Sequence, residues 1–391
     1  MEDAYIIAGF RSAIGKAGRG GFRNYRSDDL AVDIIKHLMS QVPELDPSMV
    51  DDVIVGCANP EGEQGLQIGR QISLRALGKD VPGFVLNRYC ASGLEAISIA
   101  VAKIKANMGE CYIAGGTESM SMIPMTGYKL APSYQVARDT PDYVVGMGLT
   151  AEAVAKKFNI NRLQADTFAA QSHVKAAAAI DAGKFNDEIV PVTVEEVWVE
   201  NDKRQTKKVT VAMDEGVRRE TTAEGLGKLR PVFAADGVVT AGNSSQTSDG
   251  AAFVLVMSNT LAKKLSLKPI ARMVSCAVAG VEPIIMGIGP CAAIPKALKN
   301  AGLKLNDIDL IELNEAFAVQ ALAVIQEAGL NPDIVNVNGG ALALGHPLGC
   351  TGAKLSVQLF NELRRQNKKY GMVTACVGGG QGIAGIYELM N

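Results

Sequence analysis

An approximate internal repeat restricts the fold of this 391-residue sequence more than any other feature. An apolar strand pattern, a cysteine followed by small residues, and a strand pattern ending in glycines each occur twice, in the same order. The paired landmarks are residues 52–55 and 309–312, Cys90 and Cys350, and the glycine turns beginning at Gly115 and Gly378. Their separations are 257, 260 and 263 residues. This nearly constant spacing indicates a duplicated domain with an insertion in the first copy.

Within the first copy, short apolar strand patterns alternate with amphipathic helix patterns. The predicted strands are 4–8, 52–56, 81–86 and 110–116, and the predicted helices are 28–40, 65–77 and 91–105. A βαβαβ order predicts a mostly parallel sheet covered by helices. We therefore expect an α/β fold.

The pattern changes between residues 118 and 247. A long helical region at 149–182, broken near 159–161, precedes a hairpin with strands at 192–199 and 208–211 and a turn at 201–205. The strand pattern resumes at 251–257. We therefore divide the chain into a first half, an inserted domain and a second half. Their expected bounds are 1–117 completed by 248–267, then 118–247, and finally 268–391.

Charge and cysteine usage exclude several classes of function. The net charge of −2 provides no basic field for nucleic acid or a membrane surface, and the basic run 203–208 is expected to be a solvated hairpin tip. No apolar run approaches the roughly 20 residues of a membrane span. The seven cysteines form no C-x-x-C pair, so neither a metal site nor a redox motif is indicated. With no signal-peptide pattern, we expect a reducing, cytoplasmic location.

Cys90 lies where the strand pattern at 81–86 meets the helix pattern at 91–105. Unpaired N–H groups and the helix dipole at such a junction favour a thiolate and can bind an oxyanion. A free cysteine is also commonly a small buried core residue. Position alone leaves both interpretations open.

His346 and Cys376 strengthen the catalytic interpretation. His346 lies in a glycine-rich loop, whereas His37 and His173 lie within helical patterns and are expected to be structural. Cys376 ends the last core strand pattern before a glycine turn. Together with Cys90, these residues fit thiol chemistry with a nucleophile, a base and a second proton carrier.

Four motifs together resemble the signature motifs of the thiolase family, and the resemblance extends over essentially the whole chain. The motifs are Cys90-Ala91-Ser92-Gly93-Leu94, Asn314-Glu315-Ala316-Phe317, Gly345-His346-Pro347 and Cys376-Val377-Gly378-Gly379-Gly380-Gln381-Gly382. The resemblance implies two similar α/β halves in five layers, with an inserted loop domain that binds coenzyme A (CoA). It also implies no permanently bound cofactor and an assembly that is a homodimer or a dimer of dimers.

The resemblance further implies cleavage of a 3-ketoacyl-CoA by CoA, which yields acetyl-CoA and a shortened acyl-CoA. Cys90 would be the acylated nucleophile, and His346 would accept its proton and activate the incoming thiol. Cys376 would protonate the departing acetyl-CoA carbanion. Asn314 would hold a water that stabilises the enolate oxygen together with His346. The N–H groups of Cys90 and Gly378 would form a second oxyanion hole.

Four further positions match substrate contacts of the family. Ser245 matches a contact with the pantetheine arm of CoA, and Arg218 matches a position near its nucleotide. Met147 and Phe317 match positions that line the pocket.

The segments 63–65, 145–152 and 285–290 look more like degradative thiolases of fatty-acid β-oxidation than like biosynthetic acetoacetyl-CoA thiolases. Ala91 departs from the residues that are commoner after the nucleophile. The biosynthetic enzyme remains the alternative within the family. A decarboxylating condensing enzyme is a second alternative, although the presence of Cys376 argues against it. A non-catalytic lipid carrier is a third, and such carriers often lack part of the Cys-His-Cys set that is complete here.

Overall fold

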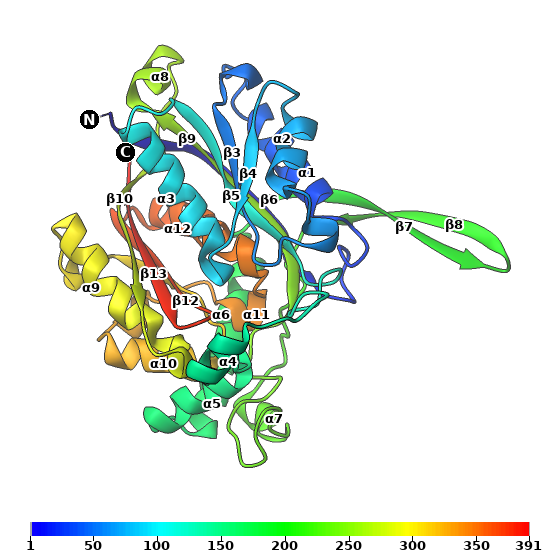
Figure 1. Ribbon diagram of the computed structural model, residues 1–391, viewed down its shortest axis with the longest axis vertical. Helices are drawn as coiled ribbons and strands as arrows, with labels where there is room; N and C mark the ends of the chain where they lie inside the picture. Colours follow the sequence, from blue (N-terminus) through cyan, green and yellow to red (C-terminus); the bar gives the residue numbers. More distant parts are fainter. Residues whose placement is uncertain (1, 391) are drawn as a thin grey trace.

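The computed structural model describes residues 2–390, and its two halves each contain one part of a large sheet (Figure 1). In the first half the central strand β3 is parallel to both β4 and β5, and β9 is antiparallel to β5 and β1. The strand order is β4 (Gly83–Leu86), β3 (Asp52–Gly56), β5 (Cys111–Ser119), β9 (Ser248–Ser258) and β1 (Ala4–Ser12).

The second half repeats this order and these directions. Its strands are β11 (Leu310–Leu313), β12 (Tyr370–Val377), β13 (Gln381–Leu389) and β10 (Ala271–Gly280). Val335 forms a parallel bridge to Ile311, on the side where β4 pairs with β3 in the first half. One antiparallel pairing, Ile6 with Ala271, joins the two halves. The predicted duplication is therefore confirmed.

The sheet is mixed, so the expectation of a mostly parallel sheet was wrong. Only three residues separate β12 from β13, and a connection this short can join only antiparallel strands. The counterpart of β13 in the first half is β9, which the chain reaches only after the long insertion. The sequence repeat shows the parallel βαβαβ part and does not show the two antiparallel strands added to each half.

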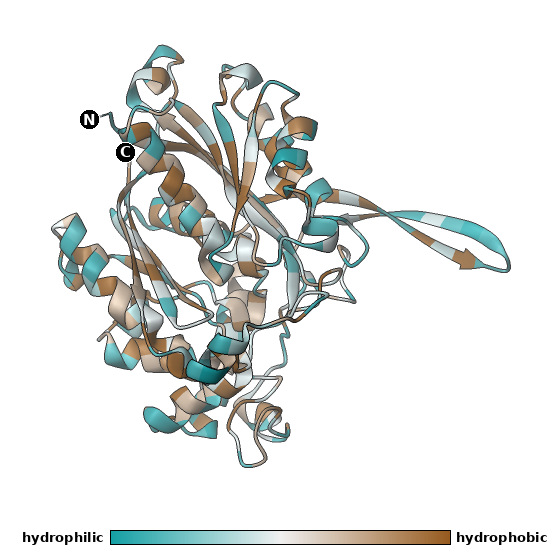
Figure 2. Ribbon diagram, in the orientation of Figure 1, coloured by the Kyte–Doolittle hydropathy of each residue, from teal (hydrophilic) through white to brown (hydrophobic). Residues whose placement is uncertain are grey.

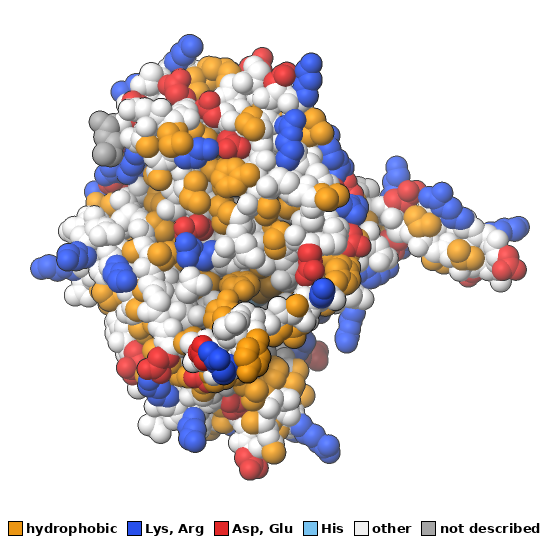
Figure 3. Space-filling view, in the orientation of Figure 1, with side chains coloured by type: hydrophobic (Ala, Val, Ile, Leu, Met, Phe, Trp, Pro, Cys, Tyr) orange, Lys and Arg blue, Asp and Glu red, His pale blue; other side chains and the backbone are white. Residues whose placement is uncertain are grey.

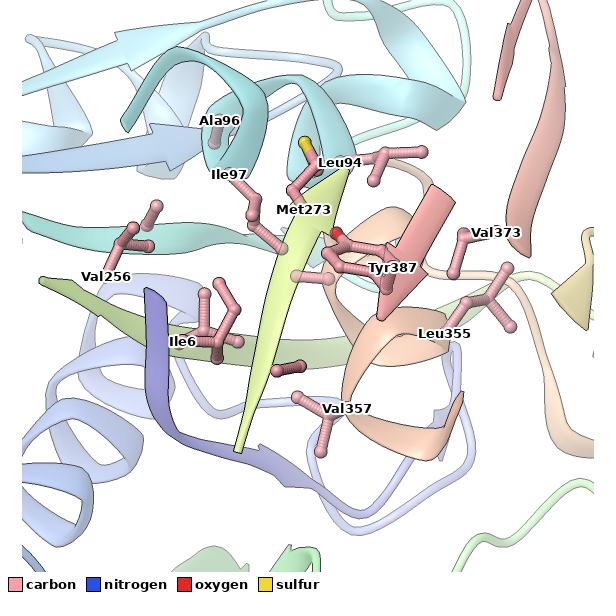
Figure 4. Packing of buried hydrophobic residues seen from close by; sticks show 14 of the residues in the cluster. Ile6, Leu94, Ala96, Ile97, Val256, Met273, Leu355, Val357, Val373 and Tyr387 are labelled. Atoms are coloured by element: carbon pink, nitrogen blue, oxygen red, sulfur yellow. The ribbon is translucent and has the colours of Figure 1, made fainter. Parts of the chain in front are cut away.

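Helices α3 (Ser92–Lys105) and α12 (Leu348–Gln366) lie between the two halves of the sheet. Figure 4 shows Leu94 and Ile97 of α3 with Leu355 of α12 in one buried cluster that includes Val256 and Val373 from the two halves. A second cluster buries α1 (Ser27–Ser40) and α2 (Ile68–Ala76) against the first half. A third buries α9 (Gly289–Ala301) and α10 (Ala318–Glu327) against the second half. These layers form the expected five-layer α/β/α/β/α arrangement.

The first turns of α3 and α12 touch through their backbones. A Cβ atom on Gly93 would lie 2.7 Å from the backbone nitrogen of Ala353, and one on Gly352 would overlap the backbone nitrogen of Leu94. Only glycine permits so close an approach. Because both contacts lie near helix N-termini, the residues just before the two helices are also brought together.

The segment between β5 and β9 carries two long helices, α5 (Met147–Lys157) and α6 (Arg162–Asp181), which confirm the predicted helical region 149–182 and its break near 159–161. Asn159 has a left-handed backbone with φ of 53° between them, and Asn161 caps α6. This segment also contains α4 (Tyr134–Asp139), α7 (Ala223–Gly227) and the hairpin strands β7 (Val192–Glu200) and β8 (Lys203–Val211). The predicted unit boundaries at 117, 247 and 267 stay a prediction.

The β7–β8 hairpin projects from the body of the molecule and its tip is hydrophilic (Figures 1 and 2). Its turn consists of Asn201 and Asp202 alone, both with positive φ, at 51° and 57°. The predicted turn at 201–205 was too long, because a two-residue turn of this type matches the twist of the strands and lets pairing continue through Lys203.

The remaining elements are short. They are β2 (Gly15–Lys16), β6 (Ile189–Val190), α8 (Asn259–Lys264), α11 (Ala341–Leu344) and the 3-10 helices η1 (Pro47–Met49), η2 (Gly62–Gln64), η3 (Tyr89–Ala91), η4 (Pro141–Val144), η5 (Pro283–Ile288), η6 (Leu305–Asp307) and η7 (Pro332–Ile334). Among residues 2–390, no helix has the length and apolar character needed to span a membrane.

Candidate active site

Cys90 occupies the tight turn η3 between β4 and α3. Tyr89 before it has a left-handed backbone, with φ of 45°. The amide N–H of Tyr89 donates to Asn87 Oδ1 at 2.7 Å, and its carbonyl accepts from Ser92 Oγ at 2.7 Å. These two hydrogen bonds hold the turn and fix the position from which the half-buried Cys90 projects.

The amide N–H groups of Cys90 and Gly378 both interact with Cys90 Sγ and lower its pKa. Burial has the larger, opposite effect, and the negative charge of Glu118 adds to it, so the pKa of Cys90 is raised to about 12. The expectation that the helix start would favour a thiolate was therefore wrong for the resting protein. The thiol is neutral because the cost of desolvation outweighs the effect of the two N–H groups.

Cys376 lies two residues before Gly378, at the end of β12. It is fully buried, and burial raises the pKa of its thiol, an effect to which the neighbouring Cys90 adds. Met286 and Ala316 form a small apolar cluster with Cys376, against which the two predicted pocket residues Met147 and Phe317 also pack.

His346 precedes α12 and is 5% exposed. Its Nδ1 lies 2.7 Å from Thr351 Oγ1, in the first turn of that helix, and its Nε2 lies 3.3 Å from Asn314 Nδ2. Because an amide NH₂ group can only donate, Nε2 is the acceptor in this arrangement and Nδ1 carries the proton. Burial, followed by the charge of Lys354, lowers the pKa of His346 to about 4, so the imidazole is a neutral base at physiological pH.

Asn314 connects His346 to the strand that carries Cys376. The backbone N–H of Asn314 donates to the carbonyl oxygen of Thr374 at 2.9 Å, just beyond the last paired residue of β11. Its Oδ1 is buried and has no hydrogen-bond partner among residues 2–390. This oxygen is therefore free to hold a polar group or a water beside His346.

Glu118 is a site-supporting residue that the sequence did not reveal. It lies at the end of β5, 1% exposed, and its carboxylate accepts hydrogen bonds from three backbone N–H groups and a side-chain amide. These donors are Ala58 N at 2.7 Å, Asn59 N at 3.3 Å, Gly349 N at 2.9 Å and Gln64 Nε2 at 2.8 Å. Gly349 belongs to the first turn of α12, so Glu118 anchors the helix start that also carries Thr351. The one sequence feature that could have indicated Glu118 is its position as a charged residue directly after Gly115–Thr117, near the end of an apolar strand pattern.

Glu315 supports the opposite side of the site and was also not predicted. It is 2% exposed and accepts from Ser172 Oγ at 2.7 Å, Asn336 Nδ2 at 2.8 Å and the backbone N–H of Leu342 at 3.2 Å. These contacts hold the segment after β11, which includes the neighbouring Asn314, against α6 and the loop before His346.

The two predicted CoA-binding residues lie in different surroundings. Ser245 is half-buried, and its amide N–H donates to Ala316 O at 3.0 Å, next to Phe317. Arg218 is exposed on the loop after β8, and its amide N–H donates to Nδ1 of His173 at 3.1 Å. The structure therefore brings Ser245 to the edge of the cysteine cluster, whereas Arg218 contacts His173 of α6. Among residues 2–390, no group of three or more His, Cys, Asp or Glu side chains could hold a metal ion.

Family models cover nearly all of this sequence. The model described as "Thiolase, N-terminal domain" matches residues 4–260, and "Thiolase, C-terminal domain" matches residues 267–389. The chain belongs to the thiolase family. This thiolase is thus an acyltransferase, as predicted from its motifs.

Individual relatives of this thiolase match over their whole length. The 3-ketoacyl-CoA thiolase of Bacillus subtilis (strain 168) is 50% identical over 392 residues, covering 100% of both chains. The 3-oxoadipyl-CoA/3-oxo-5,6-dehydrosuberyl-CoA thiolase of Escherichia coli (strain K12) is 43% identical, covering 99% of this chain and 100% of the relative. The crystal structure of the Bacillus anthracis acetyl-CoA acetyltransferase superimposes with a TM-score of 0.90 at 39% identity, covering 100% of this chain and 99% of that one.

Proposed function

We propose that this thiolase cleaves 3-ketoacyl-CoA with CoA through an acyl group carried on Cys90. The observation that carries this proposal is the meeting of three segments at one sulfur atom. Cys90 Sγ interacts with the N–H of Gly378, two residues after Cys376, while the adjoining first turn of α12 holds His346. Relatives named 3-ketoacyl-CoA thiolase, at 50% and 44% identity, support the same substrate class.

In the first half-reaction, His346 Nε2 accepts the proton of the Cys90 thiol, and the sulfur attacks the 3-keto carbon of the substrate. The oxyanion that forms accepts hydrogen bonds from the N–H groups of Cys90 and Gly378. Loss of one such donor typically slows a reaction by on the order of 10²–10³. The carbon–carbon bond then breaks, and Cys376 donates a proton to the departing acetyl-CoA carbanion. The neutral thiol and imidazole avoid the cost of a buried ion pair until substrate arrives.

The enolate oxygen of the departing acetyl-CoA is a second site of negative charge. We assign its stabilisation to His346 and to a water held by Asn314, whose buried Oδ1 is otherwise without a partner in residues 2–390. Before the second half-reaction, the proton held by His346 passes to the Cys376 thiolate, so both groups are neutral again. CoA then loses its thiol proton to His346 and takes the acyl group from Cys90, whose sulfur regains that proton. A sulfur nucleophile keeps the acyl group a thioester throughout, so the intermediate remains reactive toward the incoming thiol.

Coenzyme A acts here as a co-substrate, and no permanently bound cofactor is assigned. We place its pantetheine arm beside Ser245, which adjoins Phe317 and the cysteine cluster. We place its nucleotide near Arg218, whose exposed guanidinium can reach a phosphate. Met147 and Phe317 supply an apolar wall next to Cys376 for the acyl chain.

We further propose that the physiological direction is degradative, in fatty-acid β-oxidation. The alternative is the biosynthetic condensation of two acetyl-CoA molecules, which the similarity to an acetyl-CoA acetyltransferase structure favours. Steady-state thiolysis of acetoacetyl-CoA and of 3-ketodecanoyl-CoA separates the two. A kcat/KM for the longer substrate that equals or exceeds the four-carbon value is expected. A rate strongly favouring acetoacetyl-CoA contradicts the degradative assignment.

We further propose that the protein is a homodimer or a dimer of dimers and that it is located in the cytoplasm. Strand β4 is at the end of its sheet, and the neighbouring Leu66 is 94% exposed on a left-handed backbone. Hydrophobic side chains also gather on the surface around α4, in the segment with exposed Leu130 and Tyr134 (Figure 3). Exposed apolar surface of this kind is typical of protein interfaces.

The seven cysteines are all unpaired, which suits a reducing compartment.

A further inference from the structure

The glycine turn between β12 and β13 carries an N–H group that the proposed reaction needs at one fixed position. The turn consists of Gly378, Gly379 and Gly380, and the last two have positive φ, at 78° and 85°. Glycine has no side chain that could pack against a neighbour, and its backbone is the freest of all residues. Contacts from outside the turn must therefore fix the Gly378 N–H beside the Cys90 sulfur.

Arg88 and Gln381 connect the glycine turn to the turn that carries Cys90. Gln381 is the first residue of β13, and its Nε2 donates to the carbonyl oxygen of Gly378 in a long hydrogen bond of 3.5 Å. Its Oε1 accepts from Arg88 Nη1 at 3.0 Å. Arg88 lies just before η3, and 293 residues separate it from Gln381 in the sequence. The pair is thus a side-chain link between the two segments that meet at the sulfur.

Arg88 is itself held on the side of the nucleophile turn. Its Nη2 donates to Glu95 Oε1, in α3, at 3.1 Å, and its Nε lies 3.0 Å from Glu95 Oε2. Its backbone N–H donates to Ser92 Oγ at 2.8 Å. Both charged side chains are partly buried. An arginine suits this place because its planar guanidinium can bond two partners in fixed directions at once.

The packing around the glycine turn agrees with this arrangement. A Cβ atom on Gly378 would lie 3.6 Å from Tyr89 Cδ2, so the glycine turn lies directly against the nucleophile turn. At the other end of the turn, the N–H of Val281 donates to the carbonyl oxygen of Gly380 at 2.8 Å and ties the turn to the end of β10. The backbone bond at Gly380 and the side-chain bond at Gly378 together restrict its movement.

We propose that Arg88 and Gln381 are positioning residues that hold the Gly378 N–H against the Cys90 sulfur and the oxyanion that forms there. This inference rests on the proposed function, in which that N–H is an oxyanion donor. The two side chains act through Gly378 and need no contact with the substrate. Misplacing a group at the reaction centre by about 1 Å can cost on the order of 10²-fold in rate. A loosened turn should therefore lower kcat and leave the binding of CoA unchanged.

Steady-state thiolysis of acetoacetyl-CoA by Arg88→Leu and Gln381→Leu tests this role. Each variant is expected to lower kcat by roughly 10- to 100-fold with the KM for CoA unchanged. The double variant should be no slower than the slower single variant, because both substitutions remove the same link. Arg272→Leu is the matched control, since Arg272 also forms a partly exposed ion pair, with Glu388, at the opposite end of β10. Its kcat should match that of the unmodified chain.

A second readout follows the sulfur itself and needs no turnover. Alkylation of Cys90 by iodoacetamide in mildly alkaline buffer is measured by peptide mass. Gln381→Leu changes no charge and is expected to slow it by roughly 2- to 10-fold, because the thiolate loses a well-placed hydrogen bond. If Arg88→Leu fails to fold, Gln381→Leu decides alone.

Unchanged kcat in the folded variants, or slower turnover with an unchanged alkylation rate, overturns the positioning role. If the unmodified chain cleaves no 3-ketoacyl-CoA, the proposed function is contradicted, and the alkylation rates still decide whether Arg88 and Gln381 position the Gly378 N–H.

Discussion

At the scale of single residues, the chemistry of the site depends on burial as much as on residue type. Cys90 and His346 are a thiol and an imidazole whose pKa values burial moves to about 12 and about 4. Both groups are therefore neutral over a wide pH range. Proton transfer between them becomes favourable only when a substrate supplies the electrophile and the N–H groups stabilise the resulting oxyanion.

We predict that His346 stays neutral far below the usual pKa of a histidine. The folded pKa of about 4 lies below the ordinary value of 6.5, so the unfolded chain binds this proton first as the pH falls. The stability contributed by neutral His346 is complete above pH 6.5 and is lost progressively between 6.5 and 4. The complete loss amounts to about 3 kcal/mol of the free energy of unfolding.

Nitrogen-15 NMR of histidine-labelled protein measures this directly. Because burial also lowers the pKa of His173 to about 4, neither His346 nor His173 is expected to be protonated at pH 6. His346→Asn assigns the signal. A resonance that titrates near 6.5 and is missing from the His346→Asn spectrum would contradict the account.

Motifs in the sequence predicted the location of the reactive residues, because Cys90, His346, Asn314 and Cys376 each lie in a short, unusual stretch. The motifs did not predict the protonation states of Cys90 and His346. The burial that shifts these pKa values arises only from contacts between segments that lie far apart in the sequence. Glu118 was missed for the same reason: its partner Gly349 is 231 residues away. The catalytic roles themselves stay predictions.

At the scale of elements, the contact between α3 and α12 determines the distance between the two reactive groups. The first turns of these helices pack through glycines, and each helix start carries one side of the site. Strand ends were predicted well where a short continuous apolar run is bounded by Asp and Gly, as in β3. The start of β9 was placed three residues too late, because the polar Ser248 and Asp249 are buried there and Asp249 bonds Ser119 and Ser121.

We predict that Gly352→Ala separates the two helices. The added Cβ would overlap the backbone nitrogen of Leu94, and overpacking of this kind costs roughly 1–3 kcal/mol. Because the helices move apart at the site, kcat should fall at least tenfold. Urea unfolding and steady-state kinetics measure the two effects.

Gly227→Ala is the matched control, because Gly227 is also helical and a Cβ atom there has no neighbour within 4 Å. Its stability and kcat should match those of the unmodified chain. If Gly352→Ala behaves like this control, the helix contact does not position the site.

At the scale of the whole molecule, a buried ion cluster ties the segment between β5 and β9 to the sheet. Arg11 of β1 is fully buried and bonds Glu188 at 2.7 Å and Asp214 at 2.7 and 2.9 Å. Asp214 also accepts the amide N–H of Ile14 at 2.8 Å. No sequence pattern predicted this cluster, since its three charged members lie far apart along the chain. The duplicated architecture, in contrast, could be predicted from the repeat.

We predict that Arg11→Leu destabilises the protein by roughly 3–5 kcal/mol, because two buried carboxylates lose their partner. Urea unfolding measures the loss. Adding Glu188→Gln and Asp214→Asn to Arg11→Leu removes both uncompensated charges and should restore part of the stability. A single variant as stable as the unmodified chain would show that the cluster contributes little.

We infer that Cys90 alone carries the acyl group, and acid trapping of the intermediate is the decisive test. The protein is mixed with acetyl-CoA in the absence of free CoA, quenched in acid and digested, and the peptides are weighed. We predict one acetyl group on the peptide that contains Cys90, and neither label nor turnover in a folded Cys90→Ser variant. An acetyl group on another residue, or near-normal turnover by Cys90→Ser, would contradict the account.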